Sequence, residues 1–174
     1  MKKRSLMSCN SSVILMCKII RLNKKNLKEL AQIDYESEHQ EDKAHHISKR
    51  DMQKSLEKRF KQKQEFFFGY KEDGELKGYV TLKPFFPGHR HCEVYWLAVK
   101  KKYQGQGIGK KLMNFIEDYA KKKRFRKVCL YTGKGMIKTR GFYEKIGYEL
   151  INEFSGYYSY TEGNNTAVLY CKEI

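Results

Sequence analysis

Hydrophobic residues recur along this chain at a spacing of two in some segments, which predicts strands, and at three and four in others, which predicts helices. The predicted order is strand, two helices, three strands, helix, strand, helix and two strands. Strands are predicted at 19–22, 65–71, 76–82, 93–99, 127–132, 148–154 and 167–172, and helices after Asn23 or Asn26, near 48–62, from 110 and just before Gly147. An Asp-Gly pair at 73–74 predicts a tight hairpin turn between the second and third strands. This order predicts a single α/β sandwich around a mixed sheet.

The segment after the predicted strand 93–99 is a glycine-rich turn that leads into an amphipathic helix. The turn reads Gln104-Gly105-Gln106-Gly107-Ile108-Gly109, and Lys110 and Lys111 follow it. Unpaired backbone N–H groups and the positive end of the helix dipole make such a turn a binding site for a pyrophosphate. It is not a Walker A loop, because position 104 is not glycine and position 111 carries no hydroxyl, and it is not a dinucleotide fingerprint, because position 110 is lysine.

Two motifs carry a family resemblance. Gln104, Gly107 and Gly109 fit the pattern Gln/Arg-x-x-Gly-x-Gly/Ala, which resembles the acyl-CoA loop of the GCN5-related N-acetyltransferases, the GNAT family. The stretch from Tyr143 to Tyr148 resembles the family's second signature, a helix that ends in Tyr-x-Lys-x-Gly-Phe/Tyr. The resemblance runs from about Ile19 to the C-terminus and is specific over 93–150. It implies a GNAT-type α/β fold, with a mixed, mostly antiparallel central sheet of about seven strands flanked by about four helices.

The resemblance also implies an acetyl-CoA-dependent N-acetyltransferase and a place for each part of the coenzyme. Acetyl-CoA would lie between the strands 93–99 and 127–132, with its pantetheine arm paired to the backbone like an added strand. The implied contacts are the pantetheine-binding backbone of Leu97, Ala98 and Val99 and the pyrophosphate-binding loop of Gln104, Gly105, Gln106, Gly107, Ile108, Gly109 and Lys110.

A general base is implied at the start of the same strand. Counting back from Gln104, Glu93 takes the place of the catalytic glutamate of the histone-acetylating branch of the family, and His91 is the alternative base. Strand alternation predicts that Glu93, Tyr95 and Leu97 share one face of the sheet, toward the acceptor cleft. Burial there would raise the pKa of Glu93 and suit it to proton abstraction.

Tyr143 matches the family's usual general acid, which protonates the coenzyme sulfur as it leaves. The chain departs from the family pattern after the fifth strand. Many members have an asparagine there, whereas this chain has Gly133-Lys134-Gly135-Met136.

The charge balance favours anionic partners. Lys+Arg 36 against Asp+Glu 20 gives a formal net charge of +16, which suits nucleic acid, acidic protein or cofactor phosphates. Two other functions therefore stay open: a basic nucleic-acid-binding module with aromatic loops near Phe85 and Tyr157, and a regulator that binds coenzyme A without turnover. The acceptor is open among a protein N-terminus, a lysine, an amino acid, a nucleobase and, if the cleft is acidic, a polyamine. A homodimer through the last strands is also open.

Five cysteines without a C-x-x-C pair argue against a disulfide framework and a zinc site, and favour a reducing cytoplasm. The clusters His45-His46 and His89-Arg90-His91-Cys92 lack a second half at ligand spacing, so no metal is expected. No apolar run reaches the ~18–20 residues that span a bilayer. Residues 1–15 are interpreted as an N-terminal extension of a single domain, 16–174, and the first codon stays open between Met1 and Met16.

Overall fold

The computed structural model describes residues 17–37, 48–158 and 165–174. The strands are β1 (Cys17–Arg21), β2 (Phe66–Glu72), β3 (Glu75–Pro84), β4 (His91–Val99), β5 (Lys127–Gly133), β6 (Glu149–Phe154) and β7 (Ala167–Glu173). The helices are α1 (Leu27–Ser37), α2 (Lys49–Gln62), α3 (Ile108–Lys122) and α4 (Ile137–Lys145), with short 3-10 helices η1 (Lys24–Asn26) and η3 (Lys101–Tyr103). Every predicted strand and helix is present, and the ends differ from the prediction by only a few residues.

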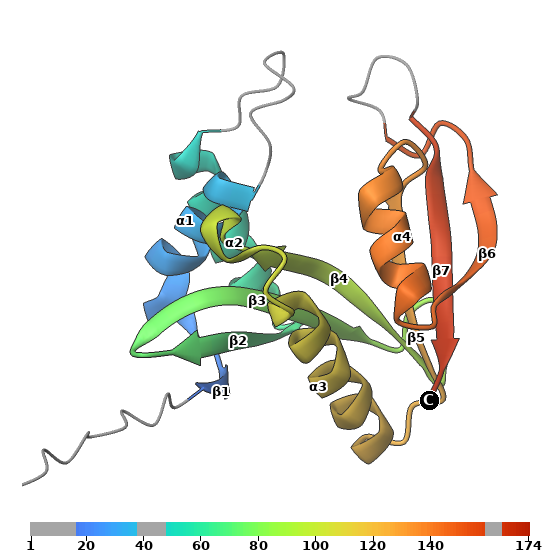
Figure 1. Ribbon diagram of the computed structural model, residues 1–174, viewed down its shortest axis with the longest axis horizontal. Helices are drawn as coiled ribbons and strands as arrows, with labels where there is room; N and C mark the ends of the chain where they lie inside the picture. The colour runs from blue at the N-terminus through green and yellow to red at the C-terminus, as the bar shows by residue number, and fades with distance from the viewer. Residues whose placement is uncertain (1–16, 38–47, 159–164) are drawn as a thin grey trace, which may run out of the picture.

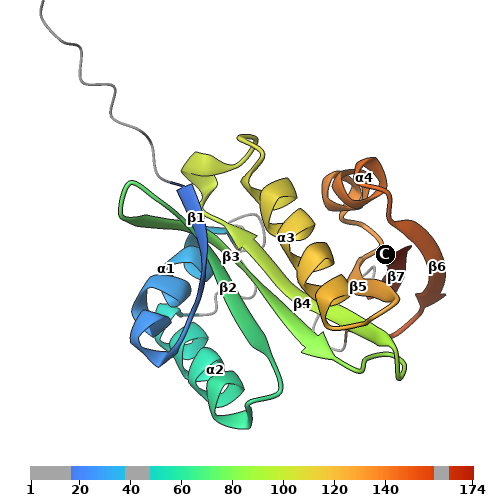
Figure 2. The same cartoon turned by 90° about the horizontal axis from the view of Figure 1, so that it is seen from below.

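The seven strands form one sheet in the order β1-β2-β3-β4-β5-β7-β6. Neighbouring strands are antiparallel except β4 and β5, which run parallel. Helices α1 and α2 lie on one face of the sheet and α3 on the other, while α4 lies beside β5 and β7 (Figures 1 and 2). The prediction of a mixed, mostly antiparallel sheet of about seven strands with about four helices is confirmed.

Each face of the sheet has its own hydrophobic cluster. On one face, α3 buries a stripe at helical spacing that packs against β2, β3 and β4: Ile108, Leu112, Met113, Ile116 and Ala120. On the other face, α1 and α2 contribute the apolar residues that cover Phe67 and Tyr79: Leu30, Ala31, Ile33, Met52 and Leu56. None of the helices within the described ranges is long and apolar enough to cross a membrane.

Local signals in the sequence fix the ends of several elements. Asp73 and Gly74 have φ of 51° and 80°, as the predicted Asp-Gly hairpin turn between β2 and β3 requires. Asn23 and Asn26 form a capping box in front of α1, and the Ser48 hydroxyl accepts from the Asp51 backbone N–H at the start of α2.

A β-bulge in β4 corrects one expectation about side-chain directions. Thr81 pairs with Trp96 and Leu82 pairs with Val94, so Tyr95 is an extra residue on β4. The bulge puts Tyr95 and Trp96 on the face of α1 and α2, and Leu97 packs into the cluster on the α3 face. The prediction that Glu93, Tyr95 and Leu97 share one face is therefore wrong for Leu97, because alternation restarts after a bulge.

The cysteine expectation also needs correction. Cys129 on β5 and Cys171 on β7 are directly opposed in the antiparallel register and form a disulfide. They are separated by 42 residues in the sequence, so their spacing carried no sign of the pairing. Cys17 and Cys92 are free thiols, and burial raises the pKa of the Cys92 thiol to about 12.

Candidate active site

Strands β4 and β5 are neighbours only at their beginnings. Three residue pairs join them, and the last pairs Glu93 with Cys129. Beyond that pair the two strands separate, so the following residues of β4 have no ladder partner on the β5 side. Leu97, Ala98 and Val99 lie in this open part of β4, where a pantetheine arm paired like an added strand would lie.

The turn after β4 has the backbone shape of an anion cradle. Gly105 and Gly107 both have φ of 78°, a conformation that favours glycine, and the space around each Cβ position is open to 4 Å. Gly107 caps α3, and no side chain bonds to the helix start. The first hydrogen bond of the helix runs from the Lys111 N–H to the Gly107 carbonyl. The N–H groups of Ile108 through Lys110 come before it and have no partner within the helix.

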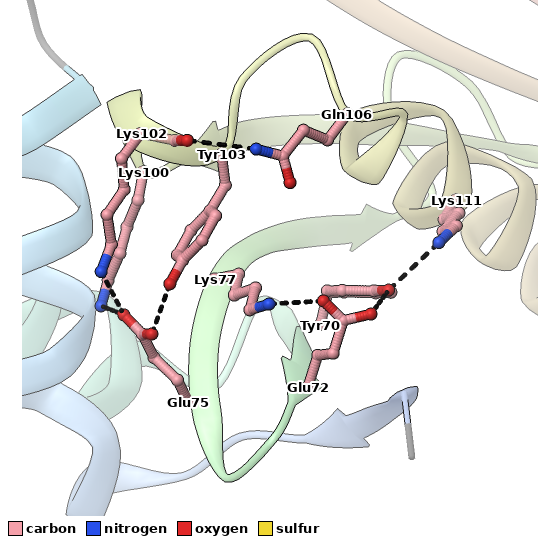
Figure 3. Close-up of polar contacts among 9 residues, drawn as sticks. All are labelled: Tyr70, Glu72, Glu75, Lys77, Lys100, Lys102, Tyr103, Gln106 and Lys111. Atoms are coloured by element: carbon pink, nitrogen blue, oxygen red, sulfur yellow. Dashed lines mark hydrogen bonds and ion pairs between the residues drawn. The ribbon is translucent and has the colours of Figure 1, made fainter. Parts of the chain in front are cut away.

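Gln104 and Gln106 brace this turn from within. The Gln104 amide donates to the Val99 carbonyl over 3.0 Å. The Gln106 amide donates to the Lys102 carbonyl over 3.2 Å, as Figure 3 shows. The Gln104 backbone N–H donates to Lys101 and is thereby occupied. The loop therefore offers backbone N–H groups mainly from Gly105 onward, and the two glutamines hold its shape.

Glu75, on the β2–β3 hairpin, anchors the same turn. Its carboxylate accepts from the Tyr103 hydroxyl at 2.5 Å and from Lys100 Nζ at 2.8 Å, and Lys102 Nζ lies 3.2 Å away (Figure 3). The Lys100 hydrogen bond, followed by that of Tyr103, lowers the pKa of Glu75 to about 2. The hairpin and the turn are thus joined by one ionised carboxylate, a role that the sequence analysis missed.

A second polar chain in Figure 3 ties the first turns of α3 to the sheet. Lys111 Nζ donates to the Tyr70 hydroxyl at 3.1 Å, and that hydroxyl donates to Glu72 at 3.0 Å. Glu72 also pairs with Lys77 at 2.5 Å. Lys111, in the position where a Walker A loop has a hydroxyl, is thereby directed toward β2.

Glu93 lies at the point where β4 and β5 separate, and its side chain is 5% exposed. Burial raises the pKa of its carboxyl group, while the charge of Lys83 opposes that rise and the charge of Glu65 adds to it. Lys83 is its direct partner in the antiparallel register with β3, and Cys129 is its neighbour on β5. A buried carboxylate with one facing cation is a sound arrangement for proton abstraction.

Aromatic and basic side chains surround Glu93 on this face. Lys83 Nζ lies 3.1 Å from the centre of the Tyr95 ring, and the Arg59 guanidinium lies 4.9 Å from it. Arg59 itself pairs with Glu65 through two nitrogens, one at 3.0 Å and one at 2.5 Å. On the β5 side, Tyr131 stacks with Tyr157 at 5.4 Å.

Tyr143 projects from α4 into the cluster on the α3 face. Its side chain is 7% exposed, and its ring lies 5.1 Å from Phe142 and 5.9 Å from Tyr148. Burial raises the pKa of its hydroxyl, so the phenol holds its proton at neutral pH. Gly147, with φ of 89°, ends the helix segment as the second motif predicts.

Of the histidines considered as a base or as metal ligands, His91 lies within the described residues. His91 begins β4 two residues before Glu93, and its ring lies 3.0 Å from the position of a Cβ on Gly88. Across the described ranges, no group of three potential ligands could hold a metal ion. His45-His46 falls outside the described residues.

The chain matches known proteins over most of this architecture. A family model described as "Acetyltransferase (GNAT) family" matches residues 25–148. The chain belongs to the GNAT acetyltransferase family. The match includes Glu93, the glycine loop and Tyr143, and acetyl-CoA is the co-substrate of this family.

A curated relative matches part of this GNAT protein in sequence. It is 33% identical over 96 residues to a "Probable N-acetyltransferase 14" of Xenopus tropicalis, over 49% of this chain and 46% of that protein. The chain thus spans about half the length of the curated relative that it matches. That protein supports the family assignment, and its own activity is not carried over.

Solved structures show the same fold. The ribosomal-protein-S18-alanine N-acetyltransferase of Escherichia coli superposes with a TM-score of 0.74 at 19% identity, over 91% of this chain and 94% of that one. The PaiA N-acetyltransferase of Thermoplasma acidophilum, solved in complex with coenzyme A, gives 0.69 at 21% identity, over 91% and 99%. A GNAT acetyltransferase of Elizabethkingia anophelis with acetyl-CoA bound gives 0.66 at 20%, over 91% and 98%.

Sequence reasoning missed three contributors to this site: the bulge at Tyr95, the Glu75 anchor and Lys83. Lys83 had a detectable signal, because it follows the buried Leu82 and so falls on the opposite face of β3. Its partnership with Glu93 depends on the β3–β4 register, which no local pattern specifies.

Proposed function

We propose that this GNAT protein transfers the acetyl group of acetyl-CoA directly to a primary amine, with Glu93 as general base and Tyr143 as general acid. One observation carries the proposal: Glu93 is buried at the last β4–β5 pair, where the strands separate, and the same β4 strand leads into the glycine cradle. Base, thioester position and pyrophosphate site thus follow one another along a single strand and turn.

The coenzyme would be held mainly by backbone. The edge of β4 at Leu97, Ala98 and Val99, which has no partner on β5, would pair with the pantetheine amides, and an N–H aimed at the thioester carbonyl would polarise it. The N–H groups from Gly105 to Lys110, with the dipole of α3, would hold the pyrophosphate. Gly105 and Gly107 both have a positive φ, the backbone conformation that glycine adopts at little cost in such a turn.

Glu93 and Tyr143 move the protons. An acceptor amine reaches the site as an ammonium, and the buried Glu93 carboxylate removes a proton so that the nitrogen lone pair can attack the thioester carbonyl. When the C–S bond breaks, the sulfur leaves as a thiolate, and the Tyr143 phenol can donate its proton to it. The raised pKa of Tyr143 keeps this donor protonated, and the raised pKa of Glu93 makes it a stronger base.

The proposal is tested by transfer of label from radiolabelled acetyl-CoA into a cell extract that is then divided into protein, RNA and small-molecule fractions. Label in one fraction with the wild-type protein, and its loss with Glu93→Gln, supports acetyl transfer and names the acceptor class. Tight binding of acetyl-CoA without label in any fraction would contradict turnover and favour the coenzyme A sensor.

A nucleic-acid-binding role is supported by one further feature. A cavity of about 340 Å³ at the end of α3 is lined by Phe85, His89, Arg90, Lys123, Arg124 and Phe125, with no acidic residue among them. Cations with an exposed phenyl ring suit phosphates and a stacked base. Binding of a labelled single-stranded RNA should fall steeply with salt and with Phe85→Ala, and salt-insensitive or undetectable binding would dismiss this role.

A further inference from the structure

Lys83 is the side chain that faces the proposed base most directly. It pairs with Glu93 across β3 and β4, on the face of the sheet opposite α3. Its Nζ lies over the Tyr95 ring, at 3.1 Å from the ring centre. Tyr95 is the bulged residue of β4, two positions beyond Glu93, in the part of the strand that no longer pairs with β5. The Lys83 amine thus extends from the base toward the place where an acetyl group would be transferred.

Lys83 has no ion pair with a carboxylate within the described residues, unlike several other lysines. Six lysines of the described residues form ion pairs with carboxylates at 3.2 Å or less: Lys77, Lys100, Lys102, Lys127, Lys134 and Lys172. Partial burial lowers the pKa of Lys83, whereas hydrogen bonds raise the pKa of Lys77, Lys102 and Lys111. An amine without a paired carboxylate loses its proton more readily and is a better nucleophile.

We propose that Lys83 is an acetylation site of the enzyme itself, modified within its own active site when no external acceptor is bound. The inference rests on the proposed function, because it uses the same coenzyme and the same base. Its acceptor is a primary amine of this chain, held beside Glu93 by the register of β3 and β4.

The step balances with the groups at hand. Glu93 takes one proton from the Lys83 ammonium through a bridging water, and the neutral amine attacks the thioester carbonyl to form an N–C bond. The C–S bond then breaks, Tyr143 protonates the thiolate, the second N–H proton passes to solvent, and the proton held by Glu93 restores the Tyr143 phenol through water. The products are an acetylated Lys83, free coenzyme A and one released proton, with no oxidation or reduction.

Acetylation of Lys83 would raise the pKa of Glu93 and fill the space over Tyr95. The amide has no charge, so Glu93 would lose the one cation that lowers its pKa, and the carboxyl pKa would rise further. The acetyl group would also lie over Tyr95 in the position of an acceptor. Both effects slow transfer to other amines at neutral pH, so the modification limits the enzyme when acetyl-CoA is abundant and acceptor is scarce.

The test uses the full-length protein, treated with a lysine deacetylase and then incubated with deuterated acetyl-CoA. Peptide mapping by mass spectrometry follows the label at Lys83 and at Lys121, an exposed lysine on α3 that reports non-enzymatic acetylation. We expect Lys83 to be labelled at least about tenfold faster than Lys121, at a rate independent of protein concentration. Glu93→Gln should remove that advantage and leave the labelling of Lys121 unchanged.

The possible outcomes separate this inference from the proposed function. Equal labelling of Lys83 and Lys121, insensitivity of Lys83 to Glu93→Gln, or a rate that rises with protein concentration would overturn self-acetylation in its own site. If Glu93-dependent transfer to amines of a cell extract occurs while Lys83 stays unlabelled, the proposed function stands and this inference is wrong. If neither is seen although acetyl-CoA binds, the proposed function itself is wrong.

Discussion

Lys83 and Glu93 face each other directly across β3 and β4, at the point where β4 leaves β5. Two opposing influences therefore act on one carboxyl group. Burial raises the pKa of Glu93, and the charge of Lys83 holds that rise back. The pKa of the proposed base is therefore set by the balance between its burial and the charge of Lys83.

Lys83→Met should raise the pKa of Glu93, because it removes the charge that stabilises the carboxylate. Since the base must be ionised to act, the acid limb of the kcat/KM profile should move to higher pH, by about one unit. The measurement is the pH–rate profile of the variant beside that of Lys121→Met, whose charge lies on the exposed side of α3. A limb that stays in place, or moves to lower pH, would show that Lys83 does not act on the base.

Gly107→Asp should abolish acetyl-CoA binding, because it puts a carboxylate into the cradle that is proposed to hold the pyrophosphate. Gly107→Asn is the matched variant, since asparagine tolerates the left-handed φ of 78° and carries no charge. Calorimetric titration with acetyl-CoA should show loss of binding for the aspartate and a much smaller effect for the asparagine. Equal affinities of wild type and Gly107→Asp would mean that the pyrophosphate binds elsewhere.

Tyr143→Phe removes a hydroxyl that forms no hydrogen bond within the described residues and keeps the ring that packs against Phe142 and Tyr148. The change should leave the melting temperature nearly unchanged and lower kcat by about 100-fold, a typical contribution of a general acid. Thermal unfolding and steady-state kinetics on the same preparation distinguish a catalytic role of the Tyr143 hydroxyl from a packing role. A large loss of stability with unchanged kcat would assign Tyr143 to packing alone.

Glu75→Gln should weaken acetyl-CoA binding by up to about tenfold, because the turn loses an ionised partner of Lys100 and Tyr103. The lowered pKa of Glu75 also predicts a pH effect on stability. Ionised Glu75 stabilises the fold fully above its ordinary pKa of 4.5, and this contribution is lost as the pH falls toward about 2. The difference in melting temperature between wild type and variant should therefore shrink over that range, and a constant difference would refute the role of the charge.

Local patterns in the sequence were sufficient to predict the elements and the glycine turn before α3. The stripe of α3, the Asp73-Gly74 turn and the glycines before Ile108 each depend on residues only a few positions apart. Their physical causes are helix periodicity and the positive φ that glycine accepts at little cost. For the same reason the motifs that indicated the GNAT family could be found without a structure.

Features that depend on strand register could not be predicted in this way. The Cys129–Cys171 disulfide, the Lys83–Glu93 pair and the reversal of Leu97 each need the pairing of strands that local sequence does not specify. One extra residue at Tyr95 was enough to turn Leu97 to the other face of the sheet. The Glu75 anchor likewise joins a hairpin to a turn 25 residues away in the sequence.

Glu93→Gln tests most directly whether Glu93 is the base of an acetyl transfer. The amide keeps the size of the side chain and cannot take the proton, so kcat should fall by about 100-fold or more while the calorimetric affinity for acetyl-CoA stays nearly unchanged. Glu149→Gln, an exposed glutamate on β6, is the matched control and should behave as wild type. A Glu93→Gln enzyme with unaltered turnover and pH–rate profile would contradict the account.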